Sequence, residues 1–492
     1  MAPRRALPRR RAGFVGRLRH GSPRSGLGVL QPPHRSLWLE QTQGDAPDAP
    51  PLHGQAKADV AIIGAGYVGL WTAIRIKELD PSVDVAVIEQ DIAGGGASGR
   101  NGGFVLSWWP KLATLAHRFG DREAVAIAQE SEVAIDQLAA FCRDHAIDAD
   151  FRRGGWIWTA TAEAHRGSWG GVLKVCERMA VAPFRPTDSG ETARRTGSTR
   201  HLEGVFDPTA AMVQPAALVR GLRRVALAAG VRLYEQTPVR RFTRGRPVRL
   251  TVPNGELVAD RLVIATNAWG AGIRELAGSI AVISSDLIAT EPIPDRLAAI
   301  GWEPDLAITD SQTMVDYYRI SRDGRVIFGK GGWTIAYGDR IGPAFDRHPA
   351  RAALVAADWR RYYPMLADVR LTHDWSGPID RTRDSLPMLG RLPDAEHISY
   401  GLGWSGNGVG PSVIGGRVLA SLALGRRDRW GEYPLIGQPP GGFPPPLIRF
   451  VGGHLVRAGV MSKEAAEAAG RPGSRIAAAL ASLAPAGLED KS

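Results

Sequence analysis

The sequence predicts an α/β fold, α+β overall, in which one domain is built on parallel βαβ units and a second, discontinuous domain on an antiparallel sheet. Two observations lead to this prediction. Near the start, the apolar run 60–63 is followed by a G-x-G-x-x-G turn, a helical stretch at 70–79 and a second apolar run at 83–88. Later, residues 280–335 alternate between apolar and polar, which is typical of antiparallel strands with one covered face.

The glycine turn has the residues that bind a dinucleotide. Gly64 permits the tight turn, Gly66 lets the backbone approach a pyrophosphate, and Gly69 lets the next helix pack closely on the strand. Free N–H groups at that helix's N-terminus would receive the phosphates. Glu89 stands twenty residues after Gly69, where a carboxylate accepts hydrogen bonds from a ribose diol. The spacing therefore predicts a Rossmann-like FAD/NAD(P)-binding domain, and this unit by itself fits either FAD or NAD.

Composition narrows the class of protein. The chain has 492 residues, enough for two or three domains, and is 44% hydrophobic. No apolar run approaches the roughly eighteen residues that span a bilayer, so we expect no integral membrane segment. Cys142 and Cys176 are the two cysteines, which excludes a disulfide framework, gives no metal site and favours a cytoplasmic location.

The net charge of +11 is concentrated at one end. Residues 1–39 contain nine arginines and no acid, which leaves +2 for the rest of the chain. Such an arm could bind nucleic acid or an anionic membrane, or serve as a transit peptide. Its Pro/Gly-rich composition favours a disordered basic arm at 1–35, and we expect no nucleic-acid partner.

Two further glycine-rich segments lie outside the first turn. The segment 94–103 contains Ser98, Arg100, Asn101, Gly102 and Gly103. So many glycines cost backbone entropy in a packing element, but they suit backbone that lies against a flat ligand. A strand at 398–402 leads to a second turn before the helix 411–424, which again points free N–H groups at something anionic. This second turn contains Gly403, Trp404, Gly406, Asn407, Gly408 and Val409.

The segment G-A-S-G-R-N-G-G at 96–103, following a dinucleotide fold, resembles the FAD-dependent amine oxidoreductases of the D-amino-acid oxidase (DAO) family. The resemblance covers residues 36–425. Within the family, the sequence most resembles γ-glutamylputrescine oxidase and aminophosphonate oxidoreductases. It implies non-covalent FAD rather than NAD. It also implies that the backbone of Val239 meets the adenine side, that Thr266 lies beneath the cofactor, and that the turn at 403–410 faces the flavin N1/C2=O edge.

The resemblance and the strand patterns together divide the chain into alternating segments. Three segments are expected to form the FAD-binding domain and two the substrate domain, followed by a Pro-rich connector and C-terminal helices that pack on the body or lie at a partner interface. The expected FAD-binding segments are 36–110, 205–275 and 375–430, the substrate segments are 111–204 and 276–374, and the C-terminal part is 431–492.

The implied reaction is FAD-dependent oxidation of an amine C–N bond, with hydride transfer to flavin N5 and hydrolysis of the resulting imine to a carbonyl compound. Relatives that oxidise α-amino acids have an arginine two residues after the glycine equivalent to Gly377, where this chain has Ile379. The substrate expected is therefore an ω-functionalised amine such as a γ-glutamylated diamine or an aminophosphonate. A D-amino-acid or glycine type of substrate stays the alternative, and the electron acceptor is dioxygen or another molecule.

Four residues are candidates for the chemistry. Lys330 would place a positive charge near the flavin, Trp404 and Tyr318 would form part of a cation-tolerant cage, and Arg319 would hold an anionic group. Arg381 and Arg383 are further candidates for that last role. For each residue there is also a structural interpretation, namely a solvated hairpin lysine, core aromatics, and surface or ribose-side arginines.

Two competing hypotheses remain at this level. An NAD-dependent dehydrogenase shares the first βαβ unit but does not explain the turn at 406–410. A non-enzymatic protein would use the basic arm to bind nucleic acid or membrane, with the body as a flavin-stabilised module.

Overall fold

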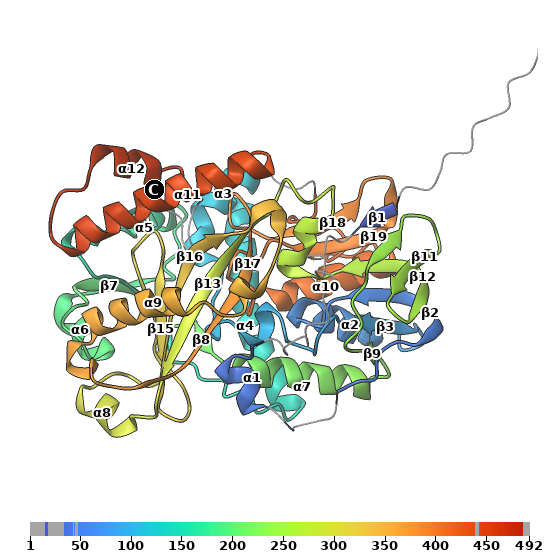
Figure 1. Cartoon of the computed structure of the whole chain (residues 1–492), viewed down its shortest axis with the longest axis horizontal. Helices are drawn as coiled ribbons and strands as arrows, with labels where there is room; N and C mark the ends of the chain where they lie inside the picture. Colours follow the sequence, from blue (N-terminus) through green and yellow to red (C-terminus); the bar gives the residue numbers. More distant parts are fainter. Residues whose placement is uncertain (1–14, 18–33, 43, 45–47, 438–441, 486–492) are drawn as a thin grey trace, which may run out of the picture.

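Two β-sheets lie beside each other and organise the molecule (Figure 1). The computed structural model describes residues 15–17, 34–42, 44, 48–437 and 442–485. Within them, one sheet has nine strands, one has eight, and a short two-stranded ribbon joins β4 (Phe104–Val105) to β8 (Ala211–Met212). The chain crosses between the two large sheets several times, as the alternating expected segments require.

The nine-stranded sheet has a parallel centre. β12 pairs in parallel with β2 and with β19, and β3 continues the parallel order to β9. Strands β1, β10 and β11 add an antiparallel edge, and β18 pairs antiparallel with β19. The strands are β1 (Val15–Arg17), β2 (Gly54–Ile63), β3 (Val85–Ile88), β9 (Arg232–Tyr234), β10 (Arg241–Thr243), β11 (Val248–Val252), β12 (Gly255–Ile264), β18 (Met388–Leu392) and β19 (Ala395–Leu402).

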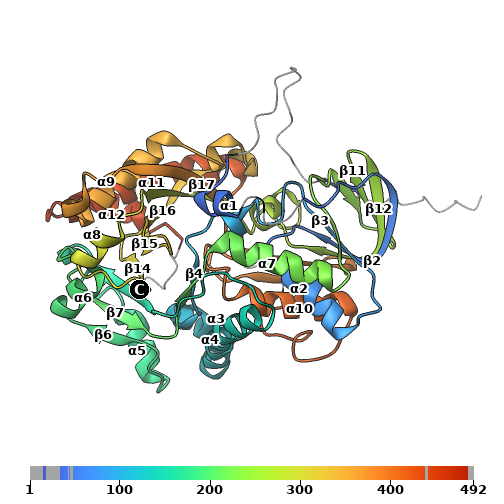
Figure 2. The same ribbon diagram turned by 90° about the horizontal axis from the view of Figure 1, so that it is seen from below.

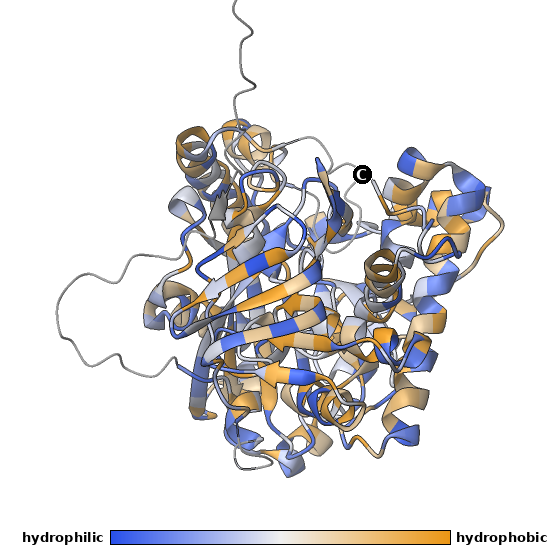
Figure 3. Ribbon diagram, turned by 90° about the vertical axis from the view of Figure 1, so that its right-hand side faces the viewer, coloured by the Kyte–Doolittle hydropathy of each residue, from blue (hydrophilic) through white to orange (hydrophobic). Residues whose placement is uncertain are grey.

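Side chains alternate across this sheet because successive residues of a strand face opposite sides. In β2, Val60 and Ile62 pack with the helices α2 (Tyr67–Leu79), α7 (Pro215–Ala228) and α10 (Ser412–Leu424). Ala61 and Ile63 instead join the core beneath β10, β11 and β12. Figure 2 shows the three helices together on one face, and Figure 3 shows apolar and polar positions mixed along the strands. Both faces of the parallel centre are covered, as a buried parallel sheet requires.

The eight-stranded sheet is antiparallel except where β14 runs parallel to β5. Helix α9 (Pro349–Tyr362) covers one face through a core that contains Ile288, Tyr318 and Trp359. The strand order is β17-β13-β16-β15-β14-β5-β7-β6. Their bounds are β5 (Trp156–Ala160), β6 (Arg185–Thr187), β7 (Glu203–Asp207), β13 (Ala281–Thr290), β14 (Ala307–Asp310), β15 (Asp316–Ile320), β16 (Val326–Ile335) and β17 (Leu371–Arg381).

The remaining elements connect the sheets or cover their ends. The helices are α1 (Leu37–Gln41), α3 (Leu112–Phe119), α4 (Asp121–Asp144), α5 (Gly170–Arg178), α6 (Ser189–Thr196), α8 (Pro294–Ala299), α11 (Pro446–Ala468) and α12 (Arg475–Ala481). The 3-10 turns are η1 (Ala97–Gly99), η2 (Trp109–Lys111), η3 (Glu163–His165), η4 (Asn267–Gly272), η5 (Tyr337–Asp339), η6 (Pro343–Phe345) and η7 (Pro364–Leu366). In the described ranges, no helix is both long and apolar enough to cross a membrane.

Most elements expected from periodicity form where the sequence placed them. The hairpin with Asp323-Gly324 at its turn joins β15 to β16, and α9 ends at Tyr362, with Tyr363 as its C-cap residue directly before Pro364. Two of the expected domain boundaries shift. Strands β7 and β17 belong to the eight-stranded sheet, although residues 205–207 of β7 and 375–381 of β17 were expected in the FAD-binding domain. Local sequence identifies an extended strand but not the neighbour with which it pairs.

The expected disordered arm at 1–35 lies mostly outside the described residues. Within it, Val15–Arg17 forms β1 and pairs with β10, so the expectation of disorder is wrong for these three residues. Arg35 then forms a two-bonded ion pair with Asp91, at 2.5 and 2.9 Å. This contact fixes the start of the body beside the nucleotide-binding strands.

Candidate active site

The first glycine turn forms as its sequence predicts. Gly64 has a positive φ of 106° and its N–H donates to Ile88 O at 2.8 Å, which ties the turn to the end of β3. A Cβ at Gly69 would clash with the Gly64 carbonyl oxygen, so the close approach of α2 requires glycine there. Gly66 is the N-cap of α2, and a Cβ at this position would lie 2.9 Å from Ser98 Oγ. The turn thus leaves open space at the N-terminus of a 13-residue helix, where a pyrophosphate binds favourably.

Glu89 follows β3 and faces the same space. Its carboxylate accepts hydrogen bonds from Ala65 N at 2.8 Å and Asp91 N at 3.0 Å. Burial raises the pKa of Glu89 to about 7, although these backbone donors act in the opposite direction. The side chain is therefore held in place and retains acceptor capacity for a ribose diol.

The loop 94–103 runs between the two sheets and is braced by its own side chains. Ser98 Oγ accepts from Tyr67 N at 3.0 Å, and Asn101 Oδ1 accepts from Gly103 N at 2.8 Å. Arg100 is 4% exposed and donates to Gly95 O and to Ser376 O on β17, while it pairs with Asp346 at 2.9 Å. Arg100 therefore fixes the loop against the eight-stranded sheet.

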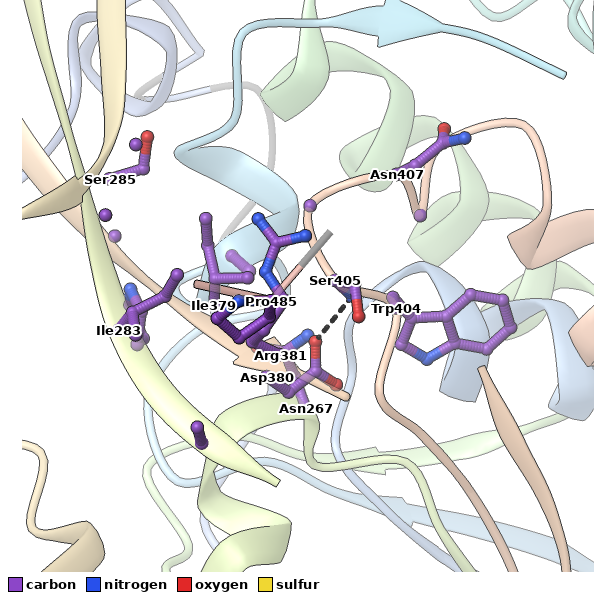
Figure 4. A pocket seen from close by; sticks show the side chains of 18 of the residues that line it. Asn267, Ile283, Ser285, Ile379, Asp380, Arg381, Trp404, Ser405, Asn407 and Pro485 are labelled. Carbon is purple, nitrogen blue, oxygen red and sulfur yellow. Dashed lines mark hydrogen bonds between the residues drawn. The ribbon is translucent and has the colours of Figure 1, made fainter. Parts of the chain in front are cut away.

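The second glycine turn is held by Asp380, a residue that the sequence reasoning missed. Its buried carboxylate accepts from Gly403 N at 2.6 Å and from Ser405 N at 3.3 Å, and Figure 4 draws the contact with Ser405. Burial raises the pKa of Asp380 to about 6, and the bonds from this turn offset part of that rise. Asn407 Nδ2 donates to Ser107 O at 3.1 Å, which ties the far side of the turn. The backbone at 403–408 is thus fixed before any ligand binds.

One large cavity connects these parts. Its volume is about 1160 Å³, and it extends from the first glycine turn past the second one to the inner face of β13, β15 and β17 and to the C-terminal helices. Figure 4 shows Asn267, Ile283, Ser285, Ile379 and Arg381 around it. Dinucleotide turns at one end and a mainly apolar chamber at the other suit a cofactor whose reactive ring meets a small substrate.

The structure brings most of the expected cofactor-binding residues to this cavity. Three others shape its turns without lining it: Gly69, Gly103 with φ 79°, and Gly403 with φ 78°. The expected cofactor-binding residues that line it are Gly64, Gly66, Glu89, Ser98, Arg100, Asn101, Gly102, Val239, Thr266, Gly406, Asn407, Gly408 and Val409.

The four expected catalytic residues fare differently. Trp404 reaches the cavity wall, but its indole is 5% exposed and packs against Gly408 and Gly415, so it supports the turn more than it cages a substrate. Tyr318 is fully buried on the opposite side of the sheet, stacked on Phe328 with ring centroids 4.6 Å apart. The expectation for Tyr318 is therefore wrong, because the alternation of β15 turns its ring into the core.

Lys330 does not face the cavity either. Its ammonium group is buried and lies 3.1 Å from both Asp316 and Asp358. Burial alone would lower its pKa, but the surrounding carboxylates outweigh this effect and raise the pKa. Both sequence interpretations, a cation beside the flavin and a solvated lysine, are thus corrected: Lys330 belongs to a buried ionic cluster.

Arg319 is also buried, and its guanidinium braces the backbone. It donates to Val213 O at 2.6 Å and to Gly103 O at 3.4 Å, and it lies over the Trp38 ring at 5.5 Å. It does not line the cavity, so its expected role as an anion holder is wrong. Of the other arginines considered, Arg381 and Arg383 do line the cavity.

Tyr317 and Ser285 are cavity residues that the sequence reasoning did not select. Their hydroxyl oxygens are 2.6 Å apart, and both side chains lie on the inner face of the eight-stranded sheet. Strand alternation could have identified Tyr317, because β15 must turn one of two adjacent tyrosines inward. Asp380 had no comparable signal, because its partners lie more than twenty residues away in the chain.

Two buried polar atoms test whether the cavity fits FAD. Thr266 Oγ1 and Asn267 Oδ1 are shielded from solvent and have no hydrogen-bond partner within the protein, yet both residues line the cavity. Buried polar atoms are normally paired, so these two indicate that a polar ligand completes them. Together with the open space at Gly66 and the acceptor Glu89, they match a dinucleotide cofactor.

Comparisons with known proteins agree with this geometry. Residues 59–422 match the family model DAO, described as FAD dependent oxidoreductase. The probable oxidoreductase OrdL of Rhizobium meliloti is 32% identical over 79% of this chain and 88% of its own, and the gamma-glutamylputrescine oxidoreductase of Escherichia coli is 27% identical over 78% and 87%. The crystal structure of glycine oxidase from Geobacillus kaustophilus superposes with a TM-score of 0.64 at 21% identity, covering 77% of this chain and 98% of that one. The match excludes the NAD-dependent alternative, and the chain belongs to the DAO family of FAD-dependent oxidoreductases.

Proposed function

We propose that this enzyme oxidises the C–N bond of an ω-functionalised amine, such as a γ-glutamylated diamine or an aminophosphonate. The observation that carries the proposal is the position of Ile379. This side chain lines the cavity next to the second glycine turn, and a Cβ at Gly406 would lie 3.7 Å from its Cδ1. The apolar Ile379 side chain cannot pair with an α-carboxylate. We therefore expect a substrate that has no charged group on the reacting carbon.

The names of the relatives support an amine as the substrate. The relatives of this chain include a gamma-glutamylputrescine oxidoreductase, glycine oxidases and a sarcosine oxidase subunit beta. Each of these enzymes is named after a compound with an oxidisable C–N bond. Bound FAD supplies the chemistry by accepting a hydride from the carbon next to the amine nitrogen, and the imine product then hydrolyses in water to a carbonyl compound.

The chain's own residues position the substrate and stabilise the negative charge that develops during the reaction. Asp380 holds the backbone of the second glycine turn, whose N–H groups and α10 N-terminus favour developing negative charge beside them. Tyr317 and Ser285 offer hydroxyl groups on the opposite wall, where they can orient an amine nitrogen. Arg381 and Arg383 add positive charge at the same end of the cavity.

The spectrum of the purified protein, followed anaerobically during addition of amines, tests the proposal. The panel contains polyamines, γ-glutamylated diamines, 2-aminoethylphosphonate, glycine and D-amino acids. We expect a flavin band that bleaches with a γ-glutamylated diamine or with the aminophosphonate. Bleaching by glycine or D-amino acids alone would favour the alternative of an α-amino-acid enzyme, and no bleaching by any amine would contradict the proposal.

We also propose a cytoplasmic enzyme that passes electrons to dioxygen or to another acceptor. The two cysteines support the location, because Cys142 and Cys176 are free thiols buried in α4 and α5. Readmission of air to the bleached protein separates the acceptors: return of the band within the turnover time indicates an oxidase, whereas slow return indicates a dehydrogenase. Cell fractionation tests the location.

A further inference from the structure

Helices α11 and α12 lie beyond the part of the chain that matches the DAO family model, which ends at residue 422. The superposition with glycine oxidase agrees, because it includes 98% of that enzyme but 77% of this chain. In Figure 2 the two helices lie with the eight-stranded sheet, near β16. The chain thus adds a helical segment to the substrate side of the common fold.

This segment is fixed to the body by buried polar contacts. Arg449 pairs with Asp339 at 2.7 and 2.8 Å and donates to Ile280 O at 2.8 Å. One turn before the end of α11, Glu464 accepts from Met314 N at 2.7 Å. Glu467 is 3.3 Å from His165. Both ends of α11 are therefore anchored, and the helix can present the same face to the cavity throughout.

The face that α11 presents to the cavity is mainly apolar and also contains Arg449, which is paired with Asp339, and Arg457. Ile448, Leu455, Val456 and Val460 line the cavity at spacings that place them on one side of a helix, and Arg457 lines it at the edge of this apolar stripe. Leu483 from the segment after α12 completes this wall. An apolar wall with one positive group suits a ligand that has a methylene chain and a terminal anion.

The charges around the cavity also favour an anion. Its described lining contains the arginines 100, 381, 383, 449 and 457 but only two acids, Glu89 and Asp380. Arg100 and Arg449 are paired with aspartates, and both acids accept hydrogen bonds from backbone N–H groups. Arginines therefore outnumber acids in the described lining of the cavity.

The position of Arg457 relates it to the substrate wall. Arg351 and Asp286, which form an ion pair with each other, are the charged groups that act on it most strongly. Burial and the nearby Arg351 lower the pKa of Arg457. A bound anion would act in the opposite direction, because it stabilises the charged guanidinium. Arg457 lines the same cavity as Ser285 and Tyr317, on the wall that α11 forms.

We propose that Arg457 of α11 binds the anionic group at the far end of the substrate, which makes the C-terminal helices the element that selects the substrate. The ligand class is a linear amine whose other end is a carboxylate or a phosphonate, with its methylene chain against Ile448, Leu455 and Val456. The inference deepens the proposed function and depends on it for the amine end only. The anionic end can be tested separately.

The test uses the full-length protein with FAD bound and ligands that cannot be oxidised. Pentanoate, propylphosphonate and the uncharged isostere 1-pentanol are titrated while the flavin absorption spectrum reports binding. The wild-type protein should bind pentanoate and propylphosphonate at least about tenfold more tightly than 1-pentanol, because a charge-assisted hydrogen bond favours the anion. Equal affinity for pentanoate and 1-pentanol would overturn the proposal without any variant.

Three variants locate the effect. Arg457→Gln should lose the preference for the anions while its affinity for 1-pentanol stays unchanged, and Arg457→Lys should retain part of it. Arg471→Gln is the matched control, since Arg471 is exposed in the connection between α11 and α12 and does not line the cavity. Unchanged anion affinity in Arg457→Gln, or an equal loss in Arg471→Gln, would contradict the assignment.

The amine end is measured in parallel with 5-aminopentanoate and pentylamine as reductants of the flavin. Reduction by 5-aminopentanoate that depends on Arg457 would support both proposals. If no amine reduces the flavin but pentanoate still binds through Arg457, then the proposed function fails and the anion site stands.

Discussion

Tyr317 and Tyr318 are adjacent in β15, yet their hydroxyl groups serve opposite sides of the sheet. Tyr317 Oη lies 2.6 Å from Ser285 Oγ at the cavity, whereas Tyr318 Oη lies 2.5 Å from His201 Nε2 in the core. Burial lowers the pKa of His201 to about 4, so this histidine is neutral at physiological pH. The two tyrosines therefore form a natural pair of variants for separating chemistry from stability.

Replacing Tyr317 by Phe should lower the rate of flavin reduction or raise the apparent Kd for the amine, with little change in stability, because the lost hydroxyl faces the cavity. Tyr318→Phe should lower the stability of the fold and leave the rate of flavin reduction and the Kd for the amine unchanged. Loss of the Tyr318 hydroxyl leaves His201 Nε2 without its partner in the core and should cost about 1–3 kcal/mol of unfolding free energy. Stopped-flow reduction and urea unfolding measure the two quantities, and an unchanged reduction rate and affinity in Tyr317→Phe would remove Tyr317 from the site.

Gly66→Val should yield protein without FAD. The added side chain would press on Ser98 Oγ and occupy the space in front of the α2 N-terminus. The ratio of flavin to protein absorbance after purification measures this loss. Gly245→Val is the control, because the space around Gly245 is open. A yellow Gly66→Val protein would show that the pyrophosphate binds elsewhere.

The affinity for FAD should fall as the pH drops below about 7. Burial raises the pKa of Glu89 to about 7, and a ribose diol donates hydrogen bonds to the charged carboxylate, so FAD favours the deprotonated form. The Kd for FAD should approach a tenfold rise per pH unit below this pKa. Glu89→Gln should bind FAD more weakly at pH of about 8 and lack this pH dependence; a profile identical to that of the wild type would assign the titration to another group, such as Asp380.

The same shift has the opposite sign for the stability of the apoprotein. The folded state holds the Glu89 proton more tightly than the unfolded chain, whose carboxyl has a pKa near 4.5. The stabilising contribution is therefore present below pH 4.5 and is lost as the pH rises through about 7. Thermal unfolding of apoprotein and of apo Glu89→Gln across this range checks the direction.

Ile379→Arg should increase the catalytic efficiency with glycine or small D-amino acids by about tenfold or more, because a guanidinium at this position of the cavity can pair with an α-carboxylate. Ile379→Met keeps the volume and adds no charge, so it should not change the selectivity. Initial rates with glycine and with the preferred amine measure the ratio, and equal ratios in both variants would place the substrate pocket away from β17.

Lys330→Met should destabilise the fold without changing how the reduced flavin reacts with dioxygen. The variant removes the cation from between Asp316 and Asp358, and breaking a buried ion pair from one side costs about 3–5 kcal/mol. Lys174→Met, at an exposed position of α5, is the control. Urea unfolding and reoxidation kinetics separate the effects; a slower reoxidation at unchanged stability would restore a role for Lys330 beside the flavin.

The sequence alone was sufficient for the nucleotide end of the site. Gly64, Gly66 and Glu89 are adjacent in one βαβ unit, and each acts through a local requirement: a positive φ, an absent side chain, or an acid at the end of a strand. The same holds for the turn at 403–410, since a strand, a glycine-rich turn and a helix follow one another in the chain. Such features depend on neighbours in sequence, and periodicity and spacing describe them directly.

The substrate end was decided by tertiary structure. Lys330, Tyr318 and Arg319 have chemistry that suits a flavin site, but their direction depends on which face of the sheet α9 and the cavity occupy. Asp380 gains its position from the turn at 403–405. Arg457 gains its position from the contacts that anchor α11, those of Arg449 with Asp339 and of Glu464 with Met314, and all of these partners lie more than twenty residues away in the chain. The alternation of a strand defines two faces but does not show which one faces the core and which the cavity. The packing of the sheets and of the C-terminal helices made one face the wall of the candidate active site.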